Sequence, residues 1–182
     1  MKAIDDRGSL QMLLDREAIR DCMYRYCRGI DRLDEKLLRS VYWPDATDRH
    51  GAYAGTASGF VDQVIGKLKR GGRRVHMLGN ILIELHSPSA AVESYFQAFQ
   101  TQRDEAGQLR ETFLCGRYVD RFEKRGDEWR VAARTVTYDW IRQAPMQDGA
   151  DDEIFGLRKP VGQRMPADPI YALLKEPPFF RA

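Results

Sequence analysis

The sequence predicts a fold of the α+β class, in which helices come first and one long, mainly antiparallel sheet follows. Two observations lead to this prediction. Apolar residues recur at helical spacing in segments between residues 12 and 68, and from residue 75 onward they alternate with polar residues. Long strands must twist and curl, and helices that cross the concave side of a curled sheet can enclose a small-molecule cavity.

Three helices are expected before the long strands. The first covers residues 12–30, where an apolar stripe contains Met12, Ile19, Met23, Tyr26 and Ile30. The second covers residues 34–42 and is expected to stop at Pro44, which cannot continue a helix. The third covers residues 59–68 and is expected to end at Gly71-Gly72.

The sheet is expected to consist of a short, weak hairpin over residues 45–55 and four long strands. The predicted strands cover residues 75–85, 90–102, 111–123 and 128–142. The turns between them contain Pro, Ser, Gly or Asp, which suit antiparallel hairpins.

A chain of 182 residues has the size of one domain with one core. We expect residues 1–143 to form that domain. Residues 144–182 are rich in Pro, Gly and Asp, which predicts a tail with one short helix near residues 168–175.

The composition is that of an ordinary globular protein and gives no sign of nucleic-acid or membrane binding. The formal net charge is only +2, and no apolar run approaches the length of a membrane span. The three cysteines lack paired or zinc-binding spacing and the N-terminus lacks the apolar core of a signal peptide, which together favour a reducing cytoplasm. Because no metal or nucleotide motif is present, we expect no metal and no cofactor.

Residues 67–74, Lys-Leu-Lys-Arg-Gly-Gly-Arg-Arg, form the densest group of basic side chains. We interpret this group as a solvated loop, because charge runs beside glycines usually face water. Binding of an anion is the alternative interpretation.

His76 and Asp31 point most directly to chemistry. A histidine can move a proton near neutral pH, and a carboxylate can fix its tautomer and stabilise its charged form. His76 falls on a predicted strand, and Asp31 directly follows the first predicted helix. The alternatives are a core histidine bonded to a backbone carbonyl and an ordinary turn aspartate, since Gly29 already signals the end of the helix.

Several segments resemble the SnoaL-like superfamily, whose members have the cone-shaped fold of nuclear transport factor 2. The segments are residues 14–21, 29–31, 41–46, 116–123 and 129–131. Their order, over roughly residues 10–142, is typical of the branch with scytalone dehydratase, hexachlorocyclohexane dehydrochlorinase and bile-acid 7α-dehydratase. The resemblance implies N-terminal helices packed on a strongly curved, mainly antiparallel sheet.

The resemblance also implies roles for individual residues. The catalytic aspartate of this branch follows the first helix, where Asp31 stands, and the catalytic histidine begins the first long strand in a context that His76 to Asn80 matches. Tyr26 matches a tyrosine that bile-acid 7α-dehydratase has five residues before the aspartate, and it would donate a hydrogen bond to a carbonyl or leaving oxygen. Arg134 is the candidate for an arginine on the last strand that helps some members bind the leaving group or the substrate. Scytalone dehydratase uses a second histidine on a later strand, but residues 90–123 contain none.

Further residues are expected to border the cavity. Tyr138 and Trp140 share the strand parity of Arg134, and a buried arginine among aromatic rings has either a carboxylate partner or an anionic ligand. His50 is expected at the cavity rim or in solvent. Tyr118 is expected at the cavity wall or in the core.

These features favour a cofactor-independent lyase or isomerase that acts on a small, mostly apolar polyketide, steroid or aromatic-derived substrate. A His76–Asp31 dyad would remove a proton, and water or halide would leave or a double bond would shift. Two alternatives stay open: a non-catalytic ligand-binding protein, and an assembly subunit resembling the small subunit of a ring-hydroxylating dioxygenase. The uncovered face of the sheet favours a homodimer or homotrimer.

Overall fold

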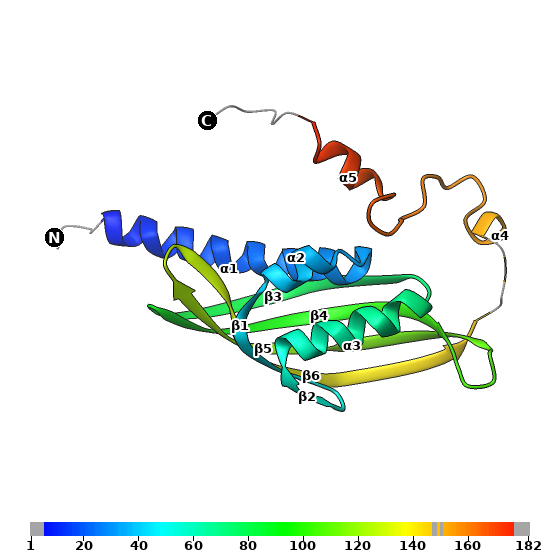
Figure 1. Ribbon diagram of the computed structural model, residues 1–182, viewed down its shortest axis with the longest axis horizontal. Coiled ribbons are helices and arrows are strands. Elements are labelled where there is room, and N and C mark those ends of the chain that lie inside the picture. Colours follow the sequence, from blue (N-terminus) through cyan, green and yellow to red (C-terminus); the bar gives the residue numbers. More distant parts are fainter. Residues whose placement is uncertain (1–5, 147–148, 150, 177–182) are drawn as a thin grey trace.

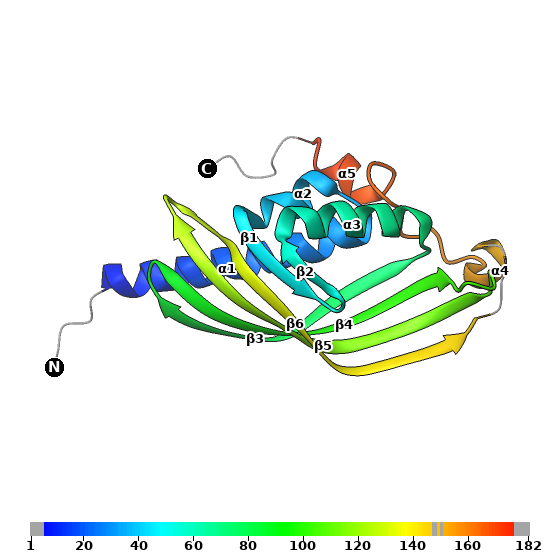
Figure 2. The ribbon, with the colours of Figure 1, turned by 60° about the horizontal axis from the view of Figure 1, so that its bottom comes forward.

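One curved sheet of six strands organises the molecule, and helices lie across its concave side (Figures 1 and 2). The computed structural model describes residues 6–146, 149 and 151–176. The strand order is β2-β1-β6-β5-β4-β3. Helices that precede and cover an open, curved sheet confirm the predicted α+β cone fold.

Four long antiparallel strands form most of the sheet: β3 (Arg74–His86), β4 (Ser89–Arg103), β5 (Leu109–Arg125) and β6 (Glu128–Pro145). The hairpin of β1 (Tyr42–His50) and β2 (Tyr53–Thr56) extends the sheet, because β1 pairs in parallel with β6. The long alternating patterns therefore predicted the strands to within a few residues.

The helices differ more from expectation. They are α1 (Asp6–Arg32), α2 (Glu35–Ser40) and α3 (Ala57–Arg70). Gly29 was expected to end the first helix, but α1 continues to Arg32 and ends where Leu33 adopts a positive φ of 54°. The absence of a side chain at Gly29 serves packing, because a Cβ there would lie 2.9 Å from the backbone of Leu38. Pro44 does not stop the second helix, which ends at Ser40, and lies instead inside β1.

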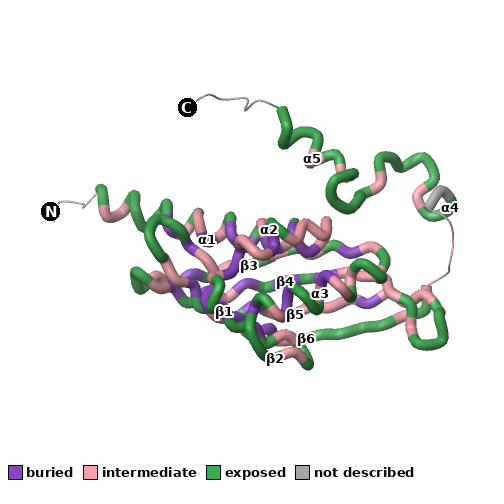
Figure 3. The backbone as a smooth tube through the Cα atoms, in the orientation of Figure 1, coloured by how far each residue is buried: buried purple, intermediate pink, exposed green. Residues whose placement is uncertain are grey.

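The core lies between α1, α3 and the concave face of the sheet. Ile19, Met23, Tyr26 and Ile30 of the predicted α1 stripe are buried, whereas Met12 is 53% exposed. Figure 3 shows the buried backbone gathered where the helices meet the strands, while the C-terminal segment is mostly exposed. None of the described helices is long and apolar enough to cross a membrane.

The C-terminal segment folds back against the wide end of the cone. It contains α4 (Asp151–Phe155), which the sequence did not predict, and α5 (Pro169–Leu173), which lies within the predicted helix. The Met165 N–H donates to the Arg32 carbonyl at the end of α1 over 2.8 Å. The Arg164 guanidinium donates to backbone carbonyls at the end of α3, including that of Gly71 at 2.6 Å.

Candidate active site

Asp31 and His76 meet at the wide end of the cone. The Asp31 Oδ1 atom lies 2.6 Å from the His76 ring Nδ1, and Asp31 Oδ2 accepts the His76 backbone N–H at 2.9 Å. Both side chains are largely buried, with 8% of Asp31 and 13% of His76 exposed. An imidazole held at Nδ1 by a carboxylate presents its Nε2 atom as the free base.

Two separate elements supply this pair. Asp31 occupies the last turn of α1, and His76 is the third residue of β3. Helix α1 is 27 residues long and ends next to the start of β3, which places Asp31 beside His76. The bond to the backbone of His76 ties the end of α1 to the sheet as well as orienting the ring.

His76 lines a cavity of about 590 Å³ inside the cone. This volume is within the range of small-molecule sites. Most of the apolar wall is formed by Ile30, Phe60, Val64, Leu68, Leu114 and Tyr138. Burial raises the pKa of the Tyr138 hydroxyl, assisted by the nearby Asp48 carboxylate, so this group stays a hydrogen-bond donor.

His50 lines the same cavity from β1. Its ring stacks on Phe60 with centroids 4.5 Å apart and meets Tyr138 edge-on at 6.3 Å. The His50 Nδ1 atom lies 3.6 Å from Asp48 Oδ1, slightly beyond hydrogen-bond length, and neither atom has another partner among the described residues. His50 was expected either at the rim of the cavity or in solvent, and the structure places it at the cavity wall.

Arg134 does not line the cavity. Its guanidinium is fully buried and bonds Asp120 with two hydrogen bonds, from Nε at 2.8 Å and from Nη2 at 2.7 Å. It also lies 4.2 Å from the ring centroid of Tyr26 and 4.4 Å from that of Tyr118. The structure thus gives Arg134 the carboxylate partner that was one of the two alternatives for a buried arginine.

A chain of polar contacts leads from this ion pair toward His50. Arg134 Nη1 donates to the Tyr42 hydroxyl at 3.3 Å, and that hydroxyl donates to Asp48 Oδ2 at 2.8 Å. Asp48 is only 1% exposed and stands next to His50, as described above. Although burial opposes the charged form of Arg134, the Asp120 carboxylate raises its pKa, so the guanidinium stays charged.

Tyr26 and Tyr118 are core residues in this structure. Both are at most 1% exposed, their rings meet edge-on at 5.4 Å, and neither borders the 590 Å³ cavity. Burial raises the pKa of each hydroxyl. The Tyr26 hydroxyl has no hydrogen-bond partner among the described residues, but the residue is fully buried and does not line the cavity that contains His76.

Trp140 lies on the opposite face of the sheet from the one expected. The pairing of β5 with β6 shifts at Asp139, so that Trp140 lies opposite Cys115 and the next residue, Ile141, lies opposite the cavity residue Leu114. A bulge of one residue reverses the parity of every side chain after it. Trp140 is accordingly 65% exposed and lines neither the cavity nor the larger hollow near the C-terminal segment, contrary to the expectation that it borders the cavity.

A family model describing a SnoaL-like domain matches residues 11–135, more than half of the chain. The chain belongs to the SnoaL-like family. A search of curated protein sequences gives no match.

Several solved structures superimpose on most of the chain. A hexachlorocyclohexane dehydrochlorinase of type 2 has a TM-score of 0.68 at 20% identity and covers 78% of this chain and 97% of its own. A candidate scytalone dehydratase from Novosphingobium aromaticivorans has a TM-score of 0.66 at 19% identity, covering 76% and 93%. The β subunit of a candidate aromatic-ring-hydroxylating dioxygenase from the same organism has 0.56 at 21%, covering 72% and 93%. At these identities the likeness shows the fold.

Three basic residues of this cavity were not predicted from the sequence. Residues 67–70 belong to the last turn of α3, and Arg74 begins β3 with 7% exposure, so only residues 71–73 of the group form a loop. Lys67, Arg70 and Arg74 all line the cavity. The alternation from Arg74 to His76 was the signal that could have placed Arg74 on the inner face.

A second, larger hollow of about 1080 Å³ lies between the wide end of the cone and the C-terminal segment. Asp31 and Arg164 line it, and it shares Arg74, Gln100 and Thr101 with the smaller cavity. The C-terminal segment therefore forms one wall of this larger hollow, which adjoins the smaller cavity at the three shared residues. No group of three or more His, Cys, Asp or Glu side chains within the described ranges is arranged to hold a metal ion.

Proposed function

We propose that this protein is a cofactor-independent lyase or isomerase in which His76 abstracts a proton from a carbon atom of a small substrate. One observation carries the proposal. The His76 ring is fixed at Nδ1 by Asp31 at 2.6 Å, and the same ring lines a cavity of small-molecule size. A general base must lie within hydrogen-bond reach of its substrate and have a defined tautomer, and this geometry provides both.

The chemical step requires a carbon acid next to an electron-withdrawing carbonyl. His76 Nε2 takes the proton, and the electron pair of the broken C–H bond forms the new double bond. In an elimination, the neighbouring C–O or C–halogen bond breaks and its electrons leave with the hydroxide or halide. In an isomerisation, the proton returns at another carbon. Asp31 stabilises the imidazolium that forms and remains ionised.

His50 and Tyr138 are positioned to assist the departing or enolising oxygen. They lie on β1 and β6, away from His76 on β3, and all three line one cavity. Tyr138 donates through its hydroxyl, and His50 donates through a ring N–H. This assignment replaces Tyr26 as hydrogen-bond donor and Arg134 as substrate anchor, because both residues are buried and neither lines the cavity.

The structure also bears on the two other functions considered. A dyad broken beyond about 4 Å would favour a binding protein without turnover, and the observed pair is much closer. A filled cone would favour an assembly subunit, and a cavity of about 590 Å³ is present instead. The similar fold of the dehydrochlorinase and of the candidate dehydratase supports the lyase.

Elimination from a panel of β-hydroxy and β-halo carbonyl compounds tests the proposal. The new conjugated double bond absorbs ultraviolet light, so turnover is read directly. Deuterium exchange into the corresponding saturated ketones, followed by proton NMR, detects proton abstraction even where no group can leave. We expect activity in the wild type and a loss of about 10²–10⁴-fold in His76→Gln, as is typical for removal of a general base.

His86→Gln is the matched control. His86 is exposed at the far end of β3, away from either cavity, so this variant should keep full activity. Equal activity of His76→Gln and wild type on a substrate that turns over would refute the proposed base. Tight binding of panel compounds without any exchange or elimination would move the ligand-binding alternative ahead.

A further inference from the structure

The charge of the 590 Å³ cavity is one-sided. Four basic side chains line it, namely Lys67, Arg70, Arg74 and Arg103, and none of its described lining residues is an aspartate or glutamate. An ordinary soluble protein surface mixes both signs of charge. A cavity that is meant only for an apolar neutral molecule has no need of this excess.

Arg74 is the buried member of this group. It is 7% exposed, and its Nη2 atom donates to two backbone carbonyls, those of Leu68 at 2.8 Å and Gly72 at 2.9 Å. Its Nε and Nη1 atoms make no hydrogen bond with the described part of the protein, and no carboxylate lies within 4 Å of the guanidinium there. A buried cation usually has an anionic partner, because removal of its hydration is costly.

The neighbouring acids do not neutralise Arg74. Burial lowers the pKa of its guanidinium, the Arg164 cation lowers it further, and Asp31 offsets this only in part. Asp31 is already bonded to both the ring and the backbone of His76. Arg164 brings a further positive charge to the same corner, since it donates to the carbonyls of Leu68, Lys69 and Gly71.

We propose that the substrate carries a carboxylate, and that Arg74 binds it with support from Lys67 and Arg70. The carboxylate would supply the anion that this corner of the cavity lacks. Hydrogen bonds between an arginine and a carboxylate are charge-assisted, and they gain strength where water is excluded. The proposal names the substrate class of the proposed lyase and rests on that function for its reaction, but not for binding.

The position of Arg74 sets the spacing within the substrate. Arg74 and His76 are two residues apart on β3, so they point to the same face about 7 Å apart along the strand. The carboxylate is therefore remote from the carbon that loses its proton. An apolar body, matched to the wall of Phe60, Val64 and Leu114, would connect the two ends.

The simpler explanation is that Arg74 only caps α3, whose last carbonyls it binds through Nη2. A cap accounts for one of its three nitrogen atoms. It does not account for Lys67 and Arg70, which have no ion pair in the described ranges and line the same cavity. Ligand binding separates the two explanations.

Two isosteric probes provide the test: 4-carboxybenzylideneacetone, an enone with a carboxylate at the far end of its ring, and its 4-carboxamide analogue. Isothermal titration calorimetry at low salt measures the affinity of each. We expect the wild type to bind the carboxylate at least about tenfold more tightly, a difference of about 1.4 kcal/mol. Arg74→Gln should abolish that preference, whereas Arg142→Gln, an exposed strand residue outside both cavities, should keep it.

Each other outcome is decisive. Equal affinity of the wild type for the two probes, or an unchanged preference in Arg74→Gln, overturns the proposal. If Arg74→Gln does not fold because α3 loses its cap, the exposed pair Lys67→Gln/Arg70→Gln takes its place, and its preference should fall at least about threefold. An unchanged preference in that double variant would show that Lys67 and Arg70 do not support carboxylate binding. The affinities of the wild type for the two probes would then decide whether the cavity binds a carboxylate.

The fate of the proposed function is measured separately. Selective binding of the carboxylate without proton exchange in carboxylated ketones would retain the anion site and reject the lyase. Exchange that is equally fast for carboxylate and carboxamide ketones would retain the lyase and reject the anion site.

Discussion

Asp31 holds His76 by two bonds that end on different parts of the residue. Oδ1 contacts the ring Nδ1 at 2.6 Å, and Oδ2 accepts the backbone N–H at 2.9 Å. One carboxylate therefore fixes both the ring and the strand that carries it. A carboxylate with both oxygens engaged has little freedom to rotate, which keeps the imidazole oriented while its charge changes.

Asp31→Asn tests this arrangement. The asparagine offers one oxygen and one NH₂ group, so one of the two His76 contacts must face a donor instead of an acceptor. We expect the rate of proton abstraction to fall by about 10²–10⁴-fold. The free energy of unfolding should fall by about 1–3 kcal/mol, because one buried bond is lost. Initial rates and denaturant unfolding measure the two effects.

Asp34→Asn is the matched control for that variant. Asp34 caps α2 by accepting the Leu37 N–H, and asparagine caps helices equally well. Both the activity and the stability of Asp34→Asn should therefore stay near wild type. An Asp31→Asn protein that is unstable but fully active per folded molecule would show that the contact is structural only.

Arg134→Met should lower the free energy of unfolding. Asp120 would remain buried without its bidentate partner, and loss of one member of a buried pair typically costs about 3–5 kcal/mol. Replacing both partners, in Asp120→Leu/Arg134→Met, should recover much of the loss because no unpaired charge remains. Thermal unfolding of the two variants checks this. A stable single variant with weakened substrate binding would instead return Arg134 to the role of substrate anchor.

The sequence predicted those elements in which apolar and polar side chains repeat with a single, uninterrupted period. The long strands alternate over ten or more residues, so their ends were predicted closely, and the family segments located Asp31 and His76 on elements that do meet. The face of the sheet on which a side chain lies could not be predicted where a bulge interrupts the alternation. The bulge at Asp139 depends on how β5 and β6 pair, and a single strand's pattern does not reveal it.

The roles of residues that contact a neighbour far away in the sequence could not be predicted either. Gly29 reads as a helix end, yet its role is to admit Leu38, which only the packing of α2 on α1 brings close. The partner of Arg134 is Asp120, directly opposite on β5, and naming it required the register of two strands. Arg74 was hidden because its neighbours in the sequence are also basic, although it alone is buried.

The ionised Asp15 carboxylate is expected to stabilise the fold, and this contribution to the free energy of unfolding should be lost in acid. Burial would raise the pKa of its carboxyl, but the side chains of Trp129, Lys124 and Gln11 lower it below the ordinary value of 3.8. Its stabilising contribution is therefore complete above about pH 3.8 and is lost as pH falls through the lower, folded-state value. Asp15→Asn should be less stable than wild type at neutral pH, and the difference should shrink in acid. Urea unfolding over this pH range measures it, with the exposed turn variant Asp127→Asn as control.

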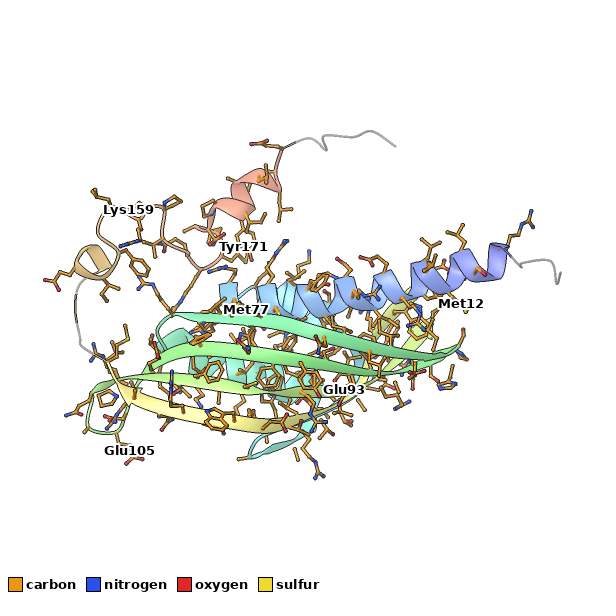
Figure 4. All side chains as sticks on the ribbon, turned by 180° about the vertical axis from the view of Figure 1, so that it is seen from behind. Met12, Met77, Glu93, Glu105, Lys159 and Tyr171 are labelled. Atoms are coloured by element: carbon orange, nitrogen blue, oxygen red, sulfur yellow. The ribbon has the colours of Figure 1, made fainter. Side chains whose placement is uncertain are left out.

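The outer face of the sheet predicts self-association. Met77, Tyr95, Val119 and Trp140 are each more than 40% exposed, and they come from the four long strands, on the face opposite α1 and α3. Met77 and Glu93 mark this side of β3 and β4 in Figure 4. An exposed apolar area on this scale usually marks an interface. We expect a homodimer or homotrimer.

Met77→Glu tests this interface without touching the cavity, because Met77 lies on the opposite face of β3 from His76. A charge buried against apolar side chains is costly, so the variant should dissociate to the 21.0 kDa monomer. Light scattering at micromolar concentration gives the mass of each species. Leu157→Glu, which changes a fully exposed leucine of the C-terminal segment, should leave the assembly intact. A wild type that is already monomeric at that concentration would rule out the interface.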